Sequence, residues 1–225
     1  GMEALVRWRN TDGSLISPAD FIPLAEETGL IIPIGRYVLR QACNDAQALI
    51  AQGRYVVVSV NISAVQFLEE SFLQMVRDAL FESKLEPEFL ELEITEGVLA
   101  KDVSKTQQVL TSLRRQGVRI AIDDFGTGYS SLTYLKRFPV DVLKIDQSFV
   151  RDMLSDKSDA AIIEAIIKLA NALDLELVAE GVETQEQAEA LQGLGCQIMQ
   201  GYLYSRPAPF SQFCVLLGPG GIPEL

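Results

Sequence analysis

The stretch Val118-Arg119-Ile120-Ala121-Ile122-Asp123-Asp124 decides the fold of this 225-residue chain. It is an apolar run of strand length that ends in two carboxylates, and its Ile-Ala-Ile centre is typical of a strand buried on both faces. Similar runs recur along the chain. We expect strands at residues 3–8, 55–61, 89–95, 118–124, 142–146, 175–180 and 198–202.

Amphipathic helical patterns lie between these strands, at residues 18–28, 34–52, 65–83, 103–116, 129–137, 159–173 and 185–194. This alternation predicts an α/β fold in which helices cover a parallel sheet. Seven strands are one fewer than a closed (β/α)8 barrel has. Because the chain opens directly on a strand, we expect either an open sheet or a barrel that lacks its first strand here.

The composition is that of an ordinary globular domain, with 48% hydrophobic and 22% charged residues. Lysine and arginine total 19 against 31 aspartate and glutamate residues, so the net charge is −12. DNA and anionic membranes are poor partners for so acidic a surface. The three cysteines are odd in number and form no CxxC pair, which favours a reducing compartment. We expect a cytoplasmic domain, either free or part of a membrane-anchored protein.

Histidine is absent from the sequence. This excludes Ser-His-Asp and Cys-His catalysis, zinc bound through histidine, and a histidine general base. Any catalysis must therefore use carboxylates, lysine, tyrosine, or hard cations bound through oxygen.

Polar side chains stand at the C-terminal ends of the predicted strands, where parallel α/β barrels build their active sites. In each strand one face is apolar and suits the helix layer, and the other carries the polar groups. The convergent set is Glu3, Asn61, Glu93, Asp123, Asp124, Lys144, Asp146 and Glu180. So many carboxylates cannot be ionised together without a cation, and Mg²⁺ or Mn²⁺ prefers such oxygen donors. The alternative is that each is a solvated residue beside a loop.

Seven motifs resemble, in order, those of the EAL domain, the bacterial cyclic di-GMP phosphodiesterase family. They are Glu3-Ala4-Leu5-Val6-Arg7-Trp8, Ser59-Val60-Asn61-Ile62-Ser63, Glu91-Leu92-Glu93-Ile94-Thr95-Glu96, Asp123-Asp124-Phe125-Gly126-Thr127-Gly128-Tyr129-Ser130-Ser131-Leu132, Lys144-Ile145-Asp146, Ala179-Glu180-Gly181-Val182-Glu183-Thr184 and Gln200-Gly201-Tyr202. The resemblance runs from Glu3 to about Phe213. It implies a modified TIM barrel with one antiparallel strand, and hydrolysis of cyclic di-GMP to linear pGpG.

The resemblance also implies two divalent cations, Mg²⁺ or Mn²⁺, that clamp the scissile phosphate. The implied ligands of one ion are Glu3, Asn61, Glu93 and Asp123. Asp123 would bridge to a second ion that Asp124 and Asp146 help to hold.

For the reaction itself, the resemblance implies that Lys144 orients the attacking water. Glu180 is implied to be either the general base or a metal ligand. Arg7 would contact the substrate phosphate, and Leu5 and Gln200 would complete substrate binding.

The remaining implied residues hold the ligands or the loop in place without binding metal or substrate themselves. They are Glu96, Glu183, Gly126 and Gly128. Glu96 would tether the loop after Asp124, which in the family couples dimerisation to metal binding. The glycines of that loop are also what a tight turn from strand to helix requires. Partners implied in this way are cyclic di-GMP, a second copy of the chain, and a sensor or GGDEF-type domain in the same polypeptide.

The chain departs from the family at its N-terminus, where it lacks a helix and a strand ahead of Glu3. We therefore expect residues 1–225 to be a single, N-terminally truncated EAL domain from a longer signalling protein. A second hypothesis is a degenerate EAL module that binds cyclic di-GMP or a protein without hydrolysis. The intact motifs favour the enzyme. A barrel lyase of the enolase type also uses carboxylates and Mg²⁺, but the motif order argues against it.

Overall fold

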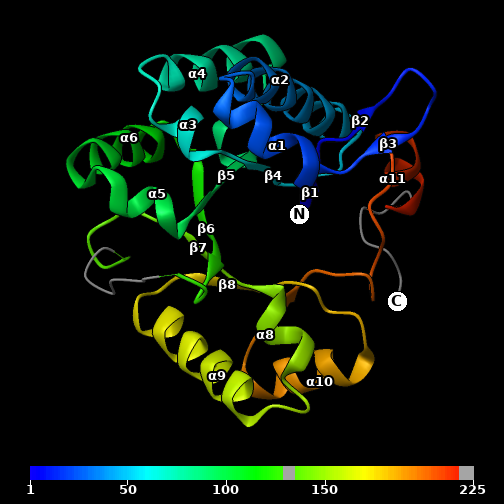
Figure 1. Cartoon of the computed structure of the whole chain (residues 1–225), viewed down its shortest axis with the longest axis vertical. Coiled ribbons are helices and arrows are strands. Elements are labelled where there is room, and N and C mark those ends of the chain that lie inside the picture. The colour runs from blue at the N-terminus through cyan, green and yellow to red at the C-terminus, as the bar shows by residue number, and fades with distance from the viewer. Residues whose placement is uncertain (129–134, 218–225) are drawn as a thin grey trace. The chain divides into compact units, whose positions relative to one another are not determined.

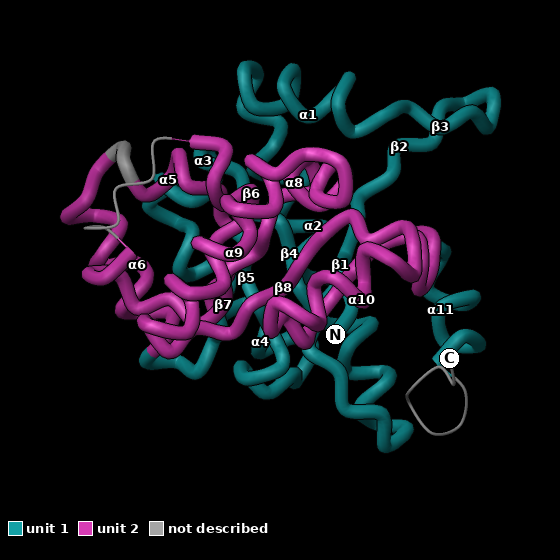
Figure 2. Tube along the Cα trace, turned by 90° about the horizontal axis from the view of Figure 1, so that it is seen from below, with its two compact units in different colours: residues 1–93, 115–119, 208–225 teal, residues 94–114, 120–207 magenta. Residues whose placement is uncertain are grey.

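The computed structural model describes residues 1–128 and 135–217. The chain divides into two compact units (Figure 2), of which unit 1 comprises residues 1–93, 115–119 and 208–225, and unit 2 comprises residues 94–114 and 120–207. The main sheet has seven strands in the order β1-β4-β5-β6-β7-β8-β9. The strands follow one another in sequence order without a reversal point. That order is the one found in α/β barrels rather than in doubly wound sheets.

Unit 1 contains the first strands, β1 (Met2–Ala4), β4 (Val58–Asn61) and the greater part of β5 (Leu90–Thr95), which pair in parallel. Its helices are α1 (Pro18–Glu27), α2 (Ile31–Ile50), α3 (Ala64–Phe67) and α4 (Phe72–Ser83), with a 3-10 turn at Pro87–Phe89. Figure 1 shows α2 and α4 lying side by side. Their packing buries one stripe of each helix, which includes Leu39, Cys43 and Val76.

The last described helix, α11 (Phe210–Leu216), also belongs to unit 1. Leu217 is buried with Leu49 at the end of α2 and with Val56, and Phe210 and Phe213 pack against this cluster. Arg54 fixes the helix from outside, because its Nη1 donates a hydrogen bond to the Cys214 carbonyl at 2.8 Å. The C-terminal segment therefore completes the core of a unit that the N-terminal segment begins.

Unit 2 contains the strands β6 (Arg119–Phe125, except its first residue), β7 (Val142–Ile145), β8 (Glu176–Ala179) and β9 (Ile198–Met199), which pair in parallel. Its helices are α5 (Glu96–Lys101), α6 (Val103–Arg115, except its last residue), α8 (Gln147–Asp152), α9 (Lys157–Ala172) and α10 (Gln185–Leu194). Strands β6 and β7 are buried along almost their whole length, as expected for strands covered on both faces.

All seven expected strands of the main sheet are present, but the first and the last are wrong in length, since β9 ends at Met199 rather than at residue 202. Strand β1 ends at Ala4, and Trp8–Arg9 (β2) instead pairs with Leu15–Ile16 (β3) in a separate antiparallel sheet. The turn explains the break, because Asp12 Oδ1 accepts from the Ser14 N–H at 2.8 Å and Gly13 takes a φ of +88°. The apolar character of residues 3–8 concealed this hairpin.

The helix expected at residues 65–83 is two helices, α3 and α4. Ser63 and Gln66 form a capping box that starts α3, the helix stops at Leu68, and α4 starts after Ser71. The three short helices α5, α8 and α11 were not expected, since six or seven residues are too few for a helical period to stand out. The helix expected at 129–137 falls largely outside the described residues.

The pairings described within the main sheet are parallel, so the antiparallel strand implied by the family resemblance is not identified among them. The absence of a strand ahead of Glu3 stays a prediction. Among the described residues, no helix has both the length and the apolar character that crossing a membrane requires.

Candidate metal centre

A β-bulge in unit 2 brings two neighbouring carboxylates to one place. Ala121 and Ile122 pair with Val142 and Leu143, but pairing resumes only at Phe125 with Ile145. Asp123 and Asp124 therefore stand opposite a single residue, Lys144. In a regular strand these two side chains would point to opposite faces. The extra residue of a bulge re-aims a side chain, and this is why both aspartates can serve one site.

The bulge is also a point of backbone strain. Asp124 has a φ of +53°, in the left-handed region that few residues other than glycine, asparagine and aspartate enter. Its own N–H donates to Asp123 Oδ1 at 3.0 Å, which fixes the first carboxylate against the backbone of the second. Strained residues of this kind gather at functional sites.

Lys144 and Glu180 complete the group on the neighbouring strands β7 and β8. Lys144 is 2% exposed, and its Nζ lies 3.4 Å from Asp123 Oδ1 and 2.5 Å from Glu180 Oε1. Glu180 follows β8 and is held there because its N–H donates to the Ile145 carbonyl at 3.1 Å. A buried ammonium group between two carboxylates offsets their charge, so this lysine has an electrostatic role in the site.

Carboxylate oxygens of Asp123, Asp124 and Glu180 all lie within 4.8 Å of one another. Burial, the charge of Asp123, and the hydrogen bond and charge of Asp146 together raise the pKa of Asp124 to about 6, although the charge of Lys144 acts to lower it. A nearby positive charge would therefore stabilise the ionised form of this carboxyl, as the charge of Lys144 already does in part.

Asp146 has a separate structural duty at the start of α8. Its Oδ1 accepts hydrogen bonds from the N–H of Ser148, at 2.9 Å, and from the Ser148 hydroxyl. Burial acts to raise the pKa of Asp146, but these hydrogen bonds outweigh it and lower the pKa. Asp146 thus caps α8 and is also hydrogen-bonded to the Asp124 side chain.

The loop after the bulge is attached to α5 through Glu96. Glu96 Oε1 accepts a hydrogen bond from the Gly126 N–H at 2.7 Å. A Cβ at Gly128 would come within 2.8 Å of Glu96 Oε2, and one at Gly126, where φ is +101°, within 2.9 Å of Phe149. The expected supporting glycines therefore let the backbone approach a carboxylate and an aromatic ring. Residues 129–132 of this motif lie outside the described residues.

Two further glycines shape the other side of the unit 2 site. Gly181, directly after Glu180, has a φ of +69°, and a Cβ there would lie 2.5 Å from Gln147 Cβ. A Cβ at Gly201 would lie 2.1 Å from the Val182 carbonyl oxygen. These contacts fix the segments that carry Glu180 and Gln200. Gln200 is exposed, as is Glu183, whose N–H donates to Gln187 Oε1 at 2.8 Å.

Unit 1 carries the other expected ligands at adjacent strand ends. Asn61 pairs in register with Glu93, and its Nδ2 donates to Glu3 Oε1 at 2.7 Å. This bond orients the amide and places its oxygen and the Glu3 carboxylate, both of them oxygen ligands suited to a hard cation, at adjacent strand ends. Glu93 is 1% exposed. Arg7 and Leu5, the expected substrate contacts, are exposed beyond the end of β1, and the Arg7 Nη1 donates to the Val6 carbonyl.

These residues fit a hard divalent cation. The donors in both units are carboxylate and amide oxygens, the ligands that Mg²⁺ and Mn²⁺ prefer, and soft donors are absent from the described cluster. The raised pKa of Asp124 comes first from burial and then from the neighbouring carboxylates, and a bound cation would oppose both effects. The fold and the site thus define a metal-binding domain of the α/β-barrel class.

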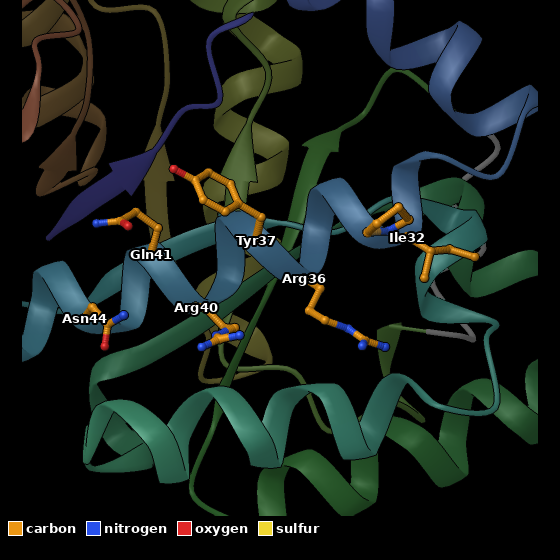
Figure 3. A pocket seen from close by; sticks show the side chains of 7 residues that line it. Ile32, Arg36, Tyr37, Arg40, Gln41 and Asn44 are labelled. Carbon is orange, nitrogen blue, oxygen red and sulfur yellow. The ribbon is translucent and has the colours of Figure 1, made fainter.

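A hollow elsewhere on unit 1 does not fit such chemistry. Its volume is about 540 Å³, and Figure 3 shows its lining side chains projecting from α2 alone. The lining residues are Ile32, Pro33, Arg36, Tyr37, Arg40, Gln41 and Asn44. This set contains no carboxylate, and Arg40 forms an ion pair with Glu82 at 2.8 Å. None of the expected site residues lies in it.

Sequence reasoning missed two features of the site. The bulge could have been suspected from the Asp-Asp pair, because one strand cannot send both side chains to the same face without it. The second is Glu91, which shares a face with Glu93 in the sequence but does not belong to the ligand set. It bonds with Ser59 and Arg119 instead.

The EAL domain family model matches residues 1–207 of this chain. The bifunctional diguanylate cyclase/cyclic di-GMP phosphodiesterase MucR of Pseudomonas aeruginosa is 47% identical over 213 residues, which are 94% of this chain and 31% of MucR. The cyclic di-GMP phosphodiesterase NbdA of the same species is 46% identical over 211 residues, which are 93% of this chain and 27% of NbdA. The chain thus spans about a third of the length of the curated relatives that it matches.

Among solved structures, the PaMucR phosphodiesterase in complex with c-di-GMP matches with a TM-score of 0.91 at 47% identity. The match covers 94% of this chain and 86% of that one. This chain therefore belongs to the EAL domain family and has the TIM-barrel-like α/β fold of that family.

Proposed function

We propose that this chain is a metal-dependent phosphodiesterase domain that hydrolyses cyclic di-GMP to linear pGpG. The observation that carries the proposal is the bulge at Asp123 and Asp124, which gathers two carboxylates beside Glu180 and Lys144. Degenerate versions of a catalytic site lose such groups first, and here each is present. The names of MucR and NbdA support the same activity.

Two Mg²⁺ or Mn²⁺ ions are the proposed cofactors. Their ligands in this proposal are Glu3, Asn61, Glu93 and Asp123 for one ion, and Asp123, Asp124 and Asp146 for the other. When bound, such ions act as Lewis acids on a phosphoryl oxygen and neutralise the charge that develops during displacement. The proposal rests on the donor chemistry of these residues and on the family resemblance.

The chain's own residues bind the substrate and move the proton. The guanidinium of Arg7 binds a phosphate oxygen pair, for which its planar fork is suited, and Leu5 and Gln200 contact the nucleotide. Lys144 Nζ donates to the attacking water and orients it. Glu180, at 2.5 Å from that ammonium group, accepts the water's proton at a carboxylate oxygen. Glu180 has an alternative role as a metal ligand. The two roles can be told apart by how turnover of a Glu180 variant depends on pH.

The proposed setting is a larger signalling polypeptide with a sensor or GGDEF-type domain. In support, this chain matches only 31% of MucR, whose name gives it a diguanylate cyclase activity as well. A homodimer is proposed through the loop after Asp124, which Glu96 attaches to α5. Size-exclusion chromatography with light scattering, with and without Mn²⁺, tests the dimer directly.

The function is tested by incubating the chain with cyclic di-GMP and following pGpG by chromatography. Mn²⁺ or Mg²⁺ should support release of pGpG. Binding of cyclic di-GMP by calorimetry without any pGpG would instead identify the binding-only EAL module, our second hypothesis. Absence of both binding and release in the presence of Mn²⁺ would reject the proposed substrate.

A further inference from the structure

A layer of bonded polar side chains lies in unit 1 on the same face of the sheet as the proposed ligands, and in it Glu91 is buried while Ser59 and Arg119 are half-buried. Ser59 Oγ donates to Glu91 Oε1 at 2.8 Å, and Arg119 Nε donates to Glu91 Oε2 at 3.1 Å. Glu91 is 7% exposed. Both of its carboxylate oxygens are thus engaged by side chains from two other strands, β4 and the start of β6.

This layer lies one step below the ligand candidates on the same two strands. In register, Ser59 pairs with Glu91, and two residues further on Asn61 pairs with Glu93. Residues two apart on a strand share a face and are separated by about 6.6 Å along it. The opposite face of the two strands carries the buried Val60 and Leu92. The Ser59–Glu91–Arg119 layer is therefore the next layer of side chains on the face that carries Asn61 and Glu93.

Stability alone does not account for this charged pair. Glu91 is buried and the Arg119 side chain is 31% exposed, so burial costs the carboxylate hydration while water screens the guanidinium, and little net stability is expected from the ion pair. The hydrogen bonds to its two oxygens do restrict the position of the Glu91 side chain, because they come from the strands on both sides of β5. A strand that slips by one residue turns every side chain to the other face, and the Ser59–Glu91 bond opposes such a slip next to the ligand pair.

We propose that Ser59, Glu91 and Arg119 are positioning residues that hold Asn61 and Glu93 in the geometry a divalent cation requires. This proposal rests on the proposed function, since it assumes that those two residues bind the metal. Groups that orient metal ligands from behind affect metal affinity by about 10- to 100-fold when they are removed. The effect should therefore appear in metal binding rather than in folding.

The decisive variant is Glu91→Leu/Arg119→Met, because it removes one charge of each sign and leaves the net charge unchanged. We expect its melting temperature without metal to stay within a few degrees of the parent. Its Mn²⁺ affinity, measured by calorimetry, should fall by about tenfold or more. Turnover of cyclic di-GMP should recover at high Mn²⁺ concentration, which a folding defect would not allow.

Two further variants keep the proposal open to refutation. Ser59→Ala is a small, charge-neutral change that removes one bond of the layer, and we expect about a threefold or greater loss of Mn²⁺ affinity. Arg40→Met/Glu82→Leu removes an exposed ion pair on the helices of the same unit and should leave Mn²⁺ affinity unchanged. Parental Mn²⁺ affinity in a folded double variant, or in Ser59→Ala if the double variant does not fold, would overturn the proposal.

Failure of the proposed function gives a different result. In that case the parent chain itself binds Mn²⁺ no better than the variants and releases no pGpG. A parent that binds Mn²⁺ and hydrolyses cyclic di-GMP, together with a double variant that does both equally well, rejects the positioning role alone.

Discussion

At the scale of single residues, the chemistry depends on a few buried charges whose states are coupled. Lys144 lies against Asp123 and Glu180, and Asp124 lies against Asp146. Asp123 and Asp146 help to raise the pKa of Asp124, whereas the hydrogen bonds of Asp146 lower its own pKa. Substitutions here should therefore separate catalysis from stability more clearly than substitutions elsewhere.

Replacement of Glu180 by alanine should reduce turnover by at least about 100-fold, the lower range for loss of a general acid–base group. Substrate binding should weaken much less, because Glu180 acts on the water in the proposed mechanism. Single-turnover release of pGpG and calorimetric binding of cyclic di-GMP measure the two quantities. Glu189→Gln, at an exposed position on α10, is the matched control and should behave as the parent. Turnover within a few-fold of the parent in Glu180→Ala would show that Glu180 is misassigned.

Replacement of Asp124 by asparagine should stabilise the metal-free protein at neutral pH and abolish turnover. The folded-state pKa of Asp124, about 6, lies above the ordinary value of about 3.9. The folded state therefore binds this proton more tightly than the unfolded state, so the group's stability contribution is present at low pH and is lost as the pH rises through 6. Asparagine cannot ionise, and it tolerates the left-handed backbone of this position.

Urea unfolding in EDTA measures this effect at pH 7.5 and near pH 4.5. The variant should be more stable than the parent at the higher pH, and the difference should shrink at the lower pH. A stability difference that does not change with pH would mean that the charge of Asp124 is not its cause.

At the scale of the elements, glycines that allow close approaches help to hold the segments that carry the site. The test is a pair of glycines in unit 2. Gly201→Ala puts a Cβ 2.1 Å from the Val182 carbonyl oxygen and should destabilise the fold by about 1–3 kcal/mol or more. Gly193→Ala, in helix α10 with no atom within 4 Å of the new Cβ, should stabilise it by roughly 0.5–1 kcal/mol. Denaturant unfolding should give opposite signs for the two variants, and equal signs would contradict this account.

How far the sequence predicted this fold and site can be seen from particular elements. The buried strands were found because runs such as Ile120-Ala121-Ile122 are too apolar for any exposed position. The hairpin at Trp8 was missed because a tight turn depends on a few local hydrogen bonds, which periodicity does not record. Glu91 and Glu93 share one pattern yet differ in their contacts, since side-chain partners come from strands distant in the sequence.

At the scale of the whole molecule, metal removal should abolish turnover. The chain in excess EDTA should release no pGpG, Mg²⁺ or Mn²⁺ should restore release, and Ca²⁺ should inhibit it. Ca²⁺ prefers longer bonds and more ligands, which spoils a closely spaced pair of ions. Mn²⁺ should also raise the melting temperature, because a ligand that binds only the folded state stabilises it. Full activity in EDTA would remove the basis of the proposed mechanism.

The docking of α11 has a practical consequence for anyone who excises this domain. The family match ends at residue 207, where the chain passes from unit 2 back to unit 1. A chain that ends there lacks α11 and Leu217. Leu49 and Val56, which Leu217 covers, would then be exposed to water. We expect a chain cut after Pro207 to aggregate or to melt well below the parent, whereas removal of 218–225 alone serves as the control. The match to the family model thus ends before the helix that the core of unit 1 uses, so a domain boundary should be set by the buried contacts of α11.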